Sequence, residues 1–324
     1  MLYGKKHPAE SAERSAAERK NHMNEFNFFS HKNYDIKVSV VTEHYGPSSS
    51  YSFGVVWSRE RCCVIDPGLG LFGNIRKYVE ANITGYEKAI YTASTCGEPQ
   101  AVGACGLFDE AFVNGPDLET AKANMAPEAR LAALRGLTAG PALLSRAESG
   151  RCTVDNSALD VMDFHDPRVL RSPGSFDHFH LGGVHLEGVS VPGYTPGSVI
   201  FTVHGDDTIN CVFCGRTISA GTNYLQNLDR AGFQLYHDSL IAAVENMKRG
   251  CEFPQKPDMS LYIFTADSPL PARLDLPENL IKASGEILAG DTAADMPAAY
   301  EGRDGYKLHI TGNAVILYNP ALLS

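Results

Sequence analysis

The stretch KAIYTASTCGEPQAVGA, residues 88–104, decides the fold predicted for this chain. The apolar run 89–91 predicts a buried strand, and a turn over 95–99 follows it. The small residues 101–104 then predict the start of a helix. Loops that follow strands carry much of the chemistry of α/β proteins, because the strands are rigid and the loop is free to present polar groups. We therefore expect this turn to lie at a functional site.

Three further stretches occur in a matching order: CCVIDPG at 62–68, VPGYTPGS at 191–198 and CVFCGRTIS at 211–219. The first and third of these read as strands that end in a corner, and the second reads as a corner between strands. Together with the opening stretch they resemble the metallo-β-lactamase superfamily, the fold of glyoxalase II and many metal-dependent hydrolases. The resemblance covers roughly residues 35–324. It implies an α/β (α+β) fold, a four-layer αββα sandwich with a helical insertion.

The positions that carry metal ligands in the resembling family hold an unsuitable set of residues in this chain. They are Cys96, Glu98, Gln100, Ala101, Tyr194, Arg216 and Asp267. Ala101 has no donor atom, and the Arg216 guanidinium cannot be deprotonated to bind a cation. Arg216 also stands where the family has the carboxylate that bridges two metals. The resemblance thus predicts the fold without its di-metal chemistry, with no metal and no cofactor.

These positions would converge into a pocket without an ion, and we assign their roles accordingly. The candidate catalytic residues are Cys96, Arg216 and Tyr194, and the candidate ligand-binding residues are Glu98, Gln100, Thr195 and Asp267. The planar guanidinium of Arg216 would bind a carboxylate or phosphate, or stabilise an oxyanion. Cys96 beside that cation would have its thiolate favoured and act as a nucleophile. Asp66 is expected to be buried and to support the 94–98 turn by bonding to its backbone.

Two alternatives stay open, so whether the protein is an enzyme is undecided by the sequence. In the first, Arg216 pairs with Glu98 or Asp267, the pocket is inert, and the protein is a non-catalytic pseudoenzyme, a structural or regulatory partner in an oligomer. In the second, the protein is a hydrolase that binds one metal through Cys96, Glu98 and Asp267. The donors in this trio are suitable. The neighbouring cation, Arg216, would repel a metal ion at this site.

A second group of polar residues lies in the predicted hairpin 176–191, which closes at Gly182-Gly183. Its pairing places apolar side chains on one face, and His178, His180, His185 and Glu187 on the other. Those four residues have donors for a metal ion. The solvated side of an amphipathic ribbon is the simpler interpretation of this face.

The eight cysteines lie in apolar strands and loops. Cys62 and Cys63 are adjacent on a strand, so their side chains point to opposite faces and should not pair with each other. The pair Cys211 and Cys214 has redox spacing, but it lies within an apolar strand, which favours core packing. This usage is typical of reduced intracellular thiols, and it predicts a cytoplasmic protein.

Composition limits the partners of the chain. A net charge of −10 argues against nucleic acid and anionic membranes, both of which need basic patches. No apolar run reaches the ~18 residues of a membrane span. We expect a small anionic molecule as partner, and a homo-oligomer remains open. Residues 1–30 predict a polar N-terminal extension and 31–324 one domain, with 117–150 as a helical insertion near the mouth of the site.

Overall fold

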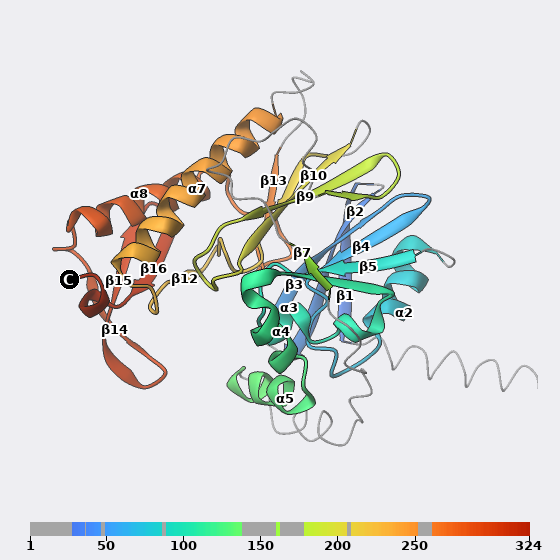
Figure 1. Cartoon of the computed structure of the whole chain (residues 1–324), viewed down its shortest axis with the longest axis horizontal. Helices are drawn as coiled ribbons and strands as arrows, with labels where there is room; N and C mark the ends of the chain where they lie inside the picture. The colour runs from blue at the N-terminus through green and yellow to red at the C-terminus, as the bar shows by residue number, and fades with distance from the viewer. Residues whose placement is uncertain are drawn as a thin grey trace, which may run out of the picture.

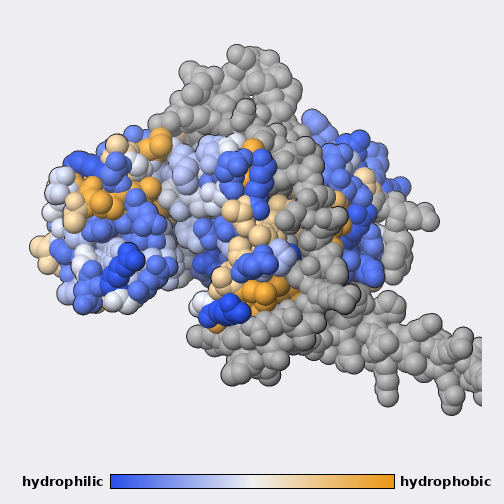
Figure 2. Space-filling view, turned by 60° about the horizontal axis from the view of Figure 1, so that its bottom comes forward, coloured by the Kyte–Doolittle hydropathy of each residue, from blue (hydrophilic) through white to orange (hydrophobic). Residues whose placement is uncertain are grey.

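The computed structural model describes residues 28–35, 37–46, 49–85, 89–137, 160–162, 178–205, 209–251 and 261–324. Within these ranges the chain forms three sheets, two of which pack against each other between layers of helices (Figure 1). On the face shown in Figure 2, polar residues predominate and apolar residues gather in separate patches. None of the described helices combines the length and the apolar character that crossing a membrane requires.

The first sheet runs in chain order from β1 to β7. Its strands are β1 (Phe29–Asp35), β2 (Val38–Gly46), β3 (Ser49–Trp57), β4 (Arg61–Ile65), β5 (Ala89–Ala93), β6 (Glu110–Asn114) and β7 (Asp160–Met162). The strands from β1 to β4 pair antiparallel, and those from β4 to β7 pair parallel. Parallel strands end at the same edge of a sheet. The loops that follow β4, β5 and β6 therefore meet at one place.

The second sheet has the order β13-β11-β10-β9-β8. Its strands are β8 (His178–His180), β9 (Val184–Ser190), β10 (Val199–Gly205), β11 (Cys211–Phe213) and β13 (Tyr262–Phe264). The β8–β9 hairpin has the predicted register, with Phe179 opposite Leu186 and His180 opposite His185. Its apolar face is buried between the two sheets, so the predicted two-residue alternation is confirmed.

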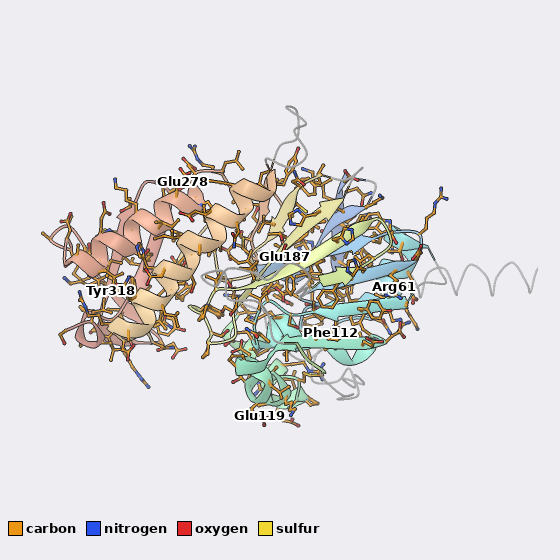
Figure 3. The ribbon with its side chains drawn as sticks, turned by 45° about the horizontal axis from the view of Figure 1, so that its top comes forward. Arg61, Phe112, Glu119, Glu187, Glu278 and Tyr318 are labelled. Atoms are coloured by element: carbon orange, nitrogen blue, oxygen red, sulfur yellow. The ribbon has the colours of Figure 1, made fainter. Side chains whose placement is uncertain are left out.

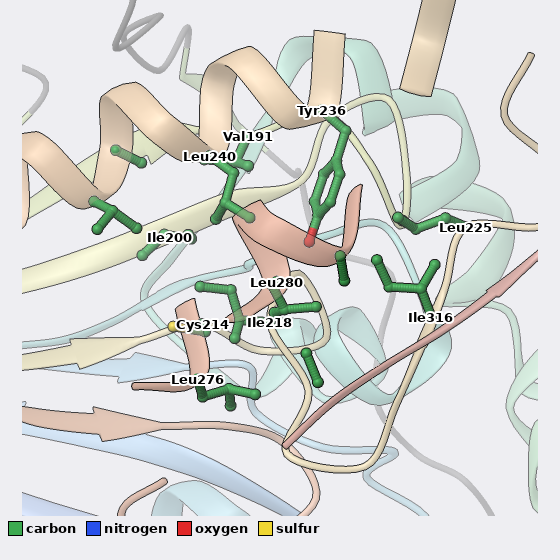
Figure 4. Close-up of a cluster of buried hydrophobic side chains, with 14 of the residues drawn as sticks. Val191, Ile200, Cys214, Ile218, Leu225, Tyr236, Leu240, Leu276, Leu280 and Ile316 are labelled. Atoms are coloured by element: carbon green, nitrogen blue, oxygen red, sulfur yellow. The ribbon is translucent and has the colours of Figure 1, made fainter. Parts of the chain in front are cut away.

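Helices cover the outer face of each of these two sheets. The first sheet is covered by α2 (Ile75–Val79), α3 (Pro99–Val102), α4 (Leu118–Asn124) and α5 (Pro127–Gly136), and the second by α7 (Arg230–Cys251) and α8 (Leu276–Ala289) (Figure 1). In Figure 4, Tyr236 and Leu240 of α7 and Leu280 of α8 lie in one buried cluster with Ile200 of β10. The structure thus has the predicted αββα layers.

Neighbouring residues of the central strands enter different cores. Val55 and Cys62 belong to the cluster beneath the outer helices, whereas Val56 and Cys63 belong to the cluster between the sheets. Both cysteines are buried. The predicted opposite orientation of Cys62 and Cys63 is therefore confirmed, and it follows from the alternation of side chains along a strand.

The third sheet, of order β12-β16-β15-β14, packs beside α8 (Figure 1). Its strands are β12 (Thr222–Tyr224), β14 (Met296–Tyr300), β15 (Arg303–Thr311) and β16 (Ala314–Tyr318). The C-terminal pair β15–β16 was predicted, but β12 and β14 were not. Because β12 pairs parallel with β16, the chain just after Arg216 runs beside the C-terminal strands.

Several boundaries differ from the predicted ones. The helix α7 begins at Arg230, earlier than the predicted start near Tyr236, because Phe233 is buried against the third sheet. In the predicted insertion the structure shows α4 and α5, while 138–150 lies outside the described residues. Short helical turns complete the description: a π-helix at η1 (Glu80–Thr84), and 3-10 helices at η2 (Cys105–Leu107), η3 (Gly115–Asp117) and η4 (Pro320–Leu322).

Candidate functional site

Asp66 joins the end of β4 to the turn after β5. It has a φ of +58°, which is uncommon for a residue other than glycine, and it is only 1% exposed. Its carboxylate accepts hydrogen bonds from the Thr95 backbone N (2.6 Å), the Thr95 hydroxyl (2.7 Å) and the Tyr51 hydroxyl (3.0 Å). Burial raises the pKa of Asp66 to about 6, although these bonds and the charge of Arg216 oppose the rise. The structure places Asp66 in contact with the backbone that the sequence assigned to it.

Asp117 makes a second link, which the sequence did not predict. Its buried carboxylate accepts hydrogen bonds from Gly97 N (2.7 Å), Gly197 N (2.8 Å) and the Thr195 hydroxyl (2.5 Å). One carboxylate therefore ties the turn after β5 to the PGYTPGS corner before β10. The approach at Gly197 is close, since a Cβ there would lie 2.5 Å from Asp117 Cγ. Local sequence held no signal for this role, because the partners are far apart in the chain.

This contact changes the role of Thr195, which we expected to bind a ligand. Its hydroxyl is already engaged by Asp117 and lies 2.9 Å from the Ser198 hydroxyl. The Ser198 hydroxyl also accepts the Thr195 backbone N–H at 2.9 Å. Thr195 is buried, and its side chain holds the corner together.

Arg216 lies just after β11 and is held by aromatic rings. Its Cζ is 5.7 Å from the centroid of Tyr51 and 5.9 Å from that of Tyr194, a range in which cation–π attraction operates. The described residues provide no ion pair or hydrogen bond to the guanidinium, and its Nε is buried without a partner. Burial alone would lower the pKa of Arg216, but surrounding groups, Tyr194 first, raise it, so the side chain remains a cation. A fixed positive charge is thus available to a ligand.

Two cavities meet at Arg216. The larger, about 440 Å³, is lined by Tyr194, Arg216, Thr222, Tyr224, Ala298, Ala299, Tyr300, Glu301, Leu308 and Leu317. The smaller, about 300 Å³, is lined by Arg216, Ser219, Gly221, Thr222, Tyr224 and Asp267. Both cavities share Arg216, Thr222 and Tyr224. Of the predicted residues, Tyr194, Arg216 and Asp267 are therefore brought together, and the third sheet adds a wall that the sequence did not predict.

The two carboxylates predicted beside Arg216 do not pair with it in the described structure. Asp267 is exposed, and its Oδ2 accepts the Ser219 hydroxyl and Gly221 N (3.0 Å). Glu98 is partly buried and occupies the N-cap position of α3, where its side chain makes no capping hydrogen bond. Burial raises the pKa of Glu98, while the charge of Arg216 lowers it. The expected direct pair of Arg216 with Glu98 or Asp267 is thus not formed.

Cys96 and Gln100 line neither cavity. Cys96 is 1% exposed and lies in the apolar cluster with Val102 and Cys105. Burial raises the pKa of its thiol far above the ordinary value, and the nearby charge of Asp66 acts in the same direction. The expectation of a favoured thiolate at Cys96 is wrong, because desolvation outweighs the nearby cation. Gln100 is buried within α3.

The residues of this site do not fit the metal ions that such a fold implies. The described residues include no group of three or more His, Cys, Asp or Glu side chains placed to hold a metal ion. A guanidinium also stands between the aromatic rings at the centre, where it would repel a divalent cation. In the hairpin, Nδ1 of His180 lies 2.8 Å from Nδ1 of His185 on the exposed face, and the His178 side chain is outside the described residues.

Comparison with solved structures identifies the fold. A metallo-β-lactamase from Erythrobacter litoralis, with β-mercaptoethanol in its active site, matches with a TM-score of 0.50 and 15% identity over 81% of this chain and 98% of that chain. Metallo-β-lactamases from Cronobacter sakazakii (a HARLDQ motif mutant; TM-score 0.47, 16% identity, 82% and 97% covered) and Hirschia baltica (0.47, 13%, 79% and 97%) are also similar. No family model and no curated protein matches the sequence. The chain therefore has the metallo-β-lactamase fold, with divergent residues at the ligand positions.

Proposed function

We propose that the protein binds a small anionic ligand at Arg216 and needs no metal ion to do so. The observation that carries this proposal is the unpartnered guanidinium at the junction of two cavities. Withdrawing a charge from water is costly unless a partner compensates for it. The aromatic rings of Tyr51 and Tyr194 compensate only in part, because they offer no acceptor atom in line with the N–H groups. A carboxylate or phosphate would supply those acceptors.

Any chemistry on the bound ligand would rely on proton donors and not on a thiolate. Burial raises the pKa of Tyr194, so its hydroxyl keeps its proton at neutral pH. Arg216 and Tyr194 both line the larger cavity and would stabilise negative charge that develops on a ligand. A hydrolase-like activity would use these two side chains.

Isothermal titration calorimetry with acetate, succinate, benzoate and inorganic phosphate tests the proposal. We expect at least one of these anions to bind, and Arg216→Met to weaken it by about 10- to 100-fold, the usual range for a charged hydrogen-bonded contact. Arg273→Met is the matched control, since Arg273 is exposed and pairs with Asp275. Equal affinity in wild type and Arg216→Met, or no binding by any ligand that carries a carboxylate or phosphate, would overturn the proposal.

A non-catalytic role as a pseudoenzyme is the second candidate, and the buried Cys96 favours it. We further propose, from composition and patterning, a cytoplasmic protein with one domain over 31–324, a polar extension over 1–30, and self-association into a homo-oligomer. Light scattering on the full chain measures the oligomeric state. A mass equal to one chain at all concentrations would remove the homo-oligomer from this proposal.

A further inference from the structure

We infer that the ligand of the Arg216 cavities is a free α-amino acid with a large apolar or aromatic side chain. This inference rests on the proposed function and names its ligand class. Three features carry it: the charges around Arg216, the arrangement of the smaller cavity, and the aromatic wall of the larger one.

The charges favour a zwitterion over a simple anion. Arg216 is the cation of the two cavities, while Asp267 lines the smaller and Glu301 the larger. The charge of Glu98 also acts on Arg216. A phosphate dianion in these cavities would be attracted by one guanidinium and repelled by the carboxylates of Asp267 and Glu301. A molecule with one carboxylate and one ammonium group would find a partner for each charge.

The smaller cavity offers both partners. Arg216 and Asp267 line it together, but they form no ion pair with each other. The Ser219 hydroxyl and Gly221 N hold Asp267 through Oδ2, and Oδ1 has no partner among the described residues. The ligand carboxylate would bind the guanidinium, and its ammonium would bind the remaining oxygen of Asp267. The ligand would thus bridge Arg216 and Asp267, which do not pair directly with each other.

The larger cavity suits the side chain of such a ligand. Its wall includes Tyr194, Tyr300, Leu308 and Ala298. The ring of Tyr300 is 5.7 Å from that of Tyr224, and Tyr224 lines both cavities. A volume of about 440 Å³ and aromatic faces accept a large flat or branched group. The head group and the side chain would thus occupy adjoining cavities with Tyr224 at the junction.

Calorimetry with L-phenylalanine, L-tryptophan and L-leucine, and with analogues that each lack one feature, tests the inference. The analogues are 3-phenylpropionate without the ammonium, 2-phenylethylamine without the carboxylate, and L-alanine without the large side chain. We expect at least one of the three large amino acids to bind about tenfold or more tightly than every analogue. Asp267→Asn should weaken the binding of that amino acid about tenfold and should not weaken the binding of 3-phenylpropionate, whereas Arg216→Met should weaken both. Asp291→Asn, at an exposed position outside the cavities, is the control.

The outcomes separate the inference from the proposed function. If phosphate or 3-phenylpropionate binds through Arg216 at least as tightly as the amino acids, the inference is wrong and the anion site stands. If an amino acid binds but Asp267→Asn has no effect on it, the assignment of the ammonium partner is overturned. If neither the amino acids nor any of the simple anions bind, both proposals are wrong.

Discussion

Asp66 and Asp117 lie at the same end of the sandwich as the Arg216 cavities. The two regions differ in how completely their polar groups are hydrogen-bonded. Each oxygen of Asp66 and Asp117 accepts a hydrogen bond from the protein. Among the described residues, Arg216 has a buried Nε without a partner, and Asp267 is held through one oxygen only. Complete bonding fixes the loops in one conformation, whereas incomplete bonding leaves capacity for a ligand. The first region is scaffold, and the second is where we propose that a ligand binds.

The largest effect should come from breaking the scaffold at Asp117. In Asp117→Ala, the buried donors of Gly97, Gly197 and Thr195 lose their acceptor. We expect the free energy of unfolding to fall by about 3–5 kcal/mol, since each unsatisfied buried donor carries its own desolvation cost. Urea denaturation followed by circular dichroism measures it.

The control for this variant is Glu119→Ala on the neighbouring helix α4. The Glu119 side chain is exposed on α4 (Figure 3). It forms an ion pair with Lys122. The Glu119→Ala substitution should change the free energy of unfolding by no more than about 0.5 kcal/mol. An Asp117→Ala protein as stable as this control would show that the carboxylate does not hold the corner.

Glu43 is a buried group of the scaffold with one oxygen left over, and it should make stability depend on pH. Its Oε2 accepts bonds from the Tyr45 hydroxyl (2.7 Å) and Leu69 N (2.8 Å), while Oε1 has no partner. Burial raises the pKa of Glu43 to about 7, against the lowering effect of these bonds and of Arg130. The folded state therefore binds the proton more tightly than the unfolded state.

This difference in proton binding makes the free energy of unfolding fall as pH rises. The stabilising contribution of protonated Glu43 is complete below the ordinary carboxyl pKa and is lost as pH rises through about 7. We expect a loss of about 2–3 kcal/mol of unfolding free energy from this group between about pH 4.5 and pH 8. Glu43→Gln, which resembles the protonated form, should flatten the profile measured by urea denaturation, and Glu110→Gln at an exposed position should not. An unchanged slope in Glu43→Gln would refute this assignment.

Arg216→Met tests the open region by its stability instead of its binding. Arg216 is a partly buried cation with no acceptor among the described residues, so its removal relieves a desolvation cost, while the methionine keeps most of the apolar contact with Tyr51 and Tyr194. We expect the free energy of unfolding to stay the same or rise by about 1 kcal/mol. Thermal unfolding without ligand provides the measurement. A clear loss of stability would mean that Arg216 is part of the scaffold.

The smallest effect concerns His309, in a network of the third sheet. His309 Nε2 lies 2.9 Å from Glu286 Oε2, and its Nδ1 lies 2.7 Å from Asp295 Oδ1. The Tyr318 hydroxyl also donates a hydrogen bond to Asp295. Burial lowers the pKa of His309, but the two carboxylates raise it by more. The contribution of this network is complete below the ordinary histidine pKa and is lost as pH rises through the raised value.

We expect less than about 1 kcal/mol from His309, because the desolvation of the ring offsets part of the gain from the two carboxylates. His309→Gln should remove this dependence at neutral to basic pH in urea denaturation. It should leave ligand binding at Arg216 unchanged, since His309 lines neither cavity. An effect of His309→Gln on binding would show that the network and the cavities are coupled.

The parts of the fold that the sequence predicted are those with a strong local pattern. Alternating residues gave the register of the β8–β9 hairpin, and the VIDPG strand end placed Asp66 at the turn after β5. The strands β12 and β14 were missed because β12 is short and β14 is mostly solvent-exposed, so neither shows a buried apolar run. Tyr224 and Tyr300, which those strands bring to the cavities, could therefore not be predicted.

By itself the sequence determined the layered fold, the strand ends that form the site, and the cation at Arg216. The tertiary structure decided which polar groups have hydrogen-bond partners within the protein and which do not. Thr195 and Asp117 bond to each other, and Cys96 is buried as a neutral thiol, whereas the Nε atom of Arg216 has no partner among the described residues. The physical reason is range: periodicity and turn chemistry act over a few residues, but desolvation and hydrogen-bond partners depend on segments that meet only after folding.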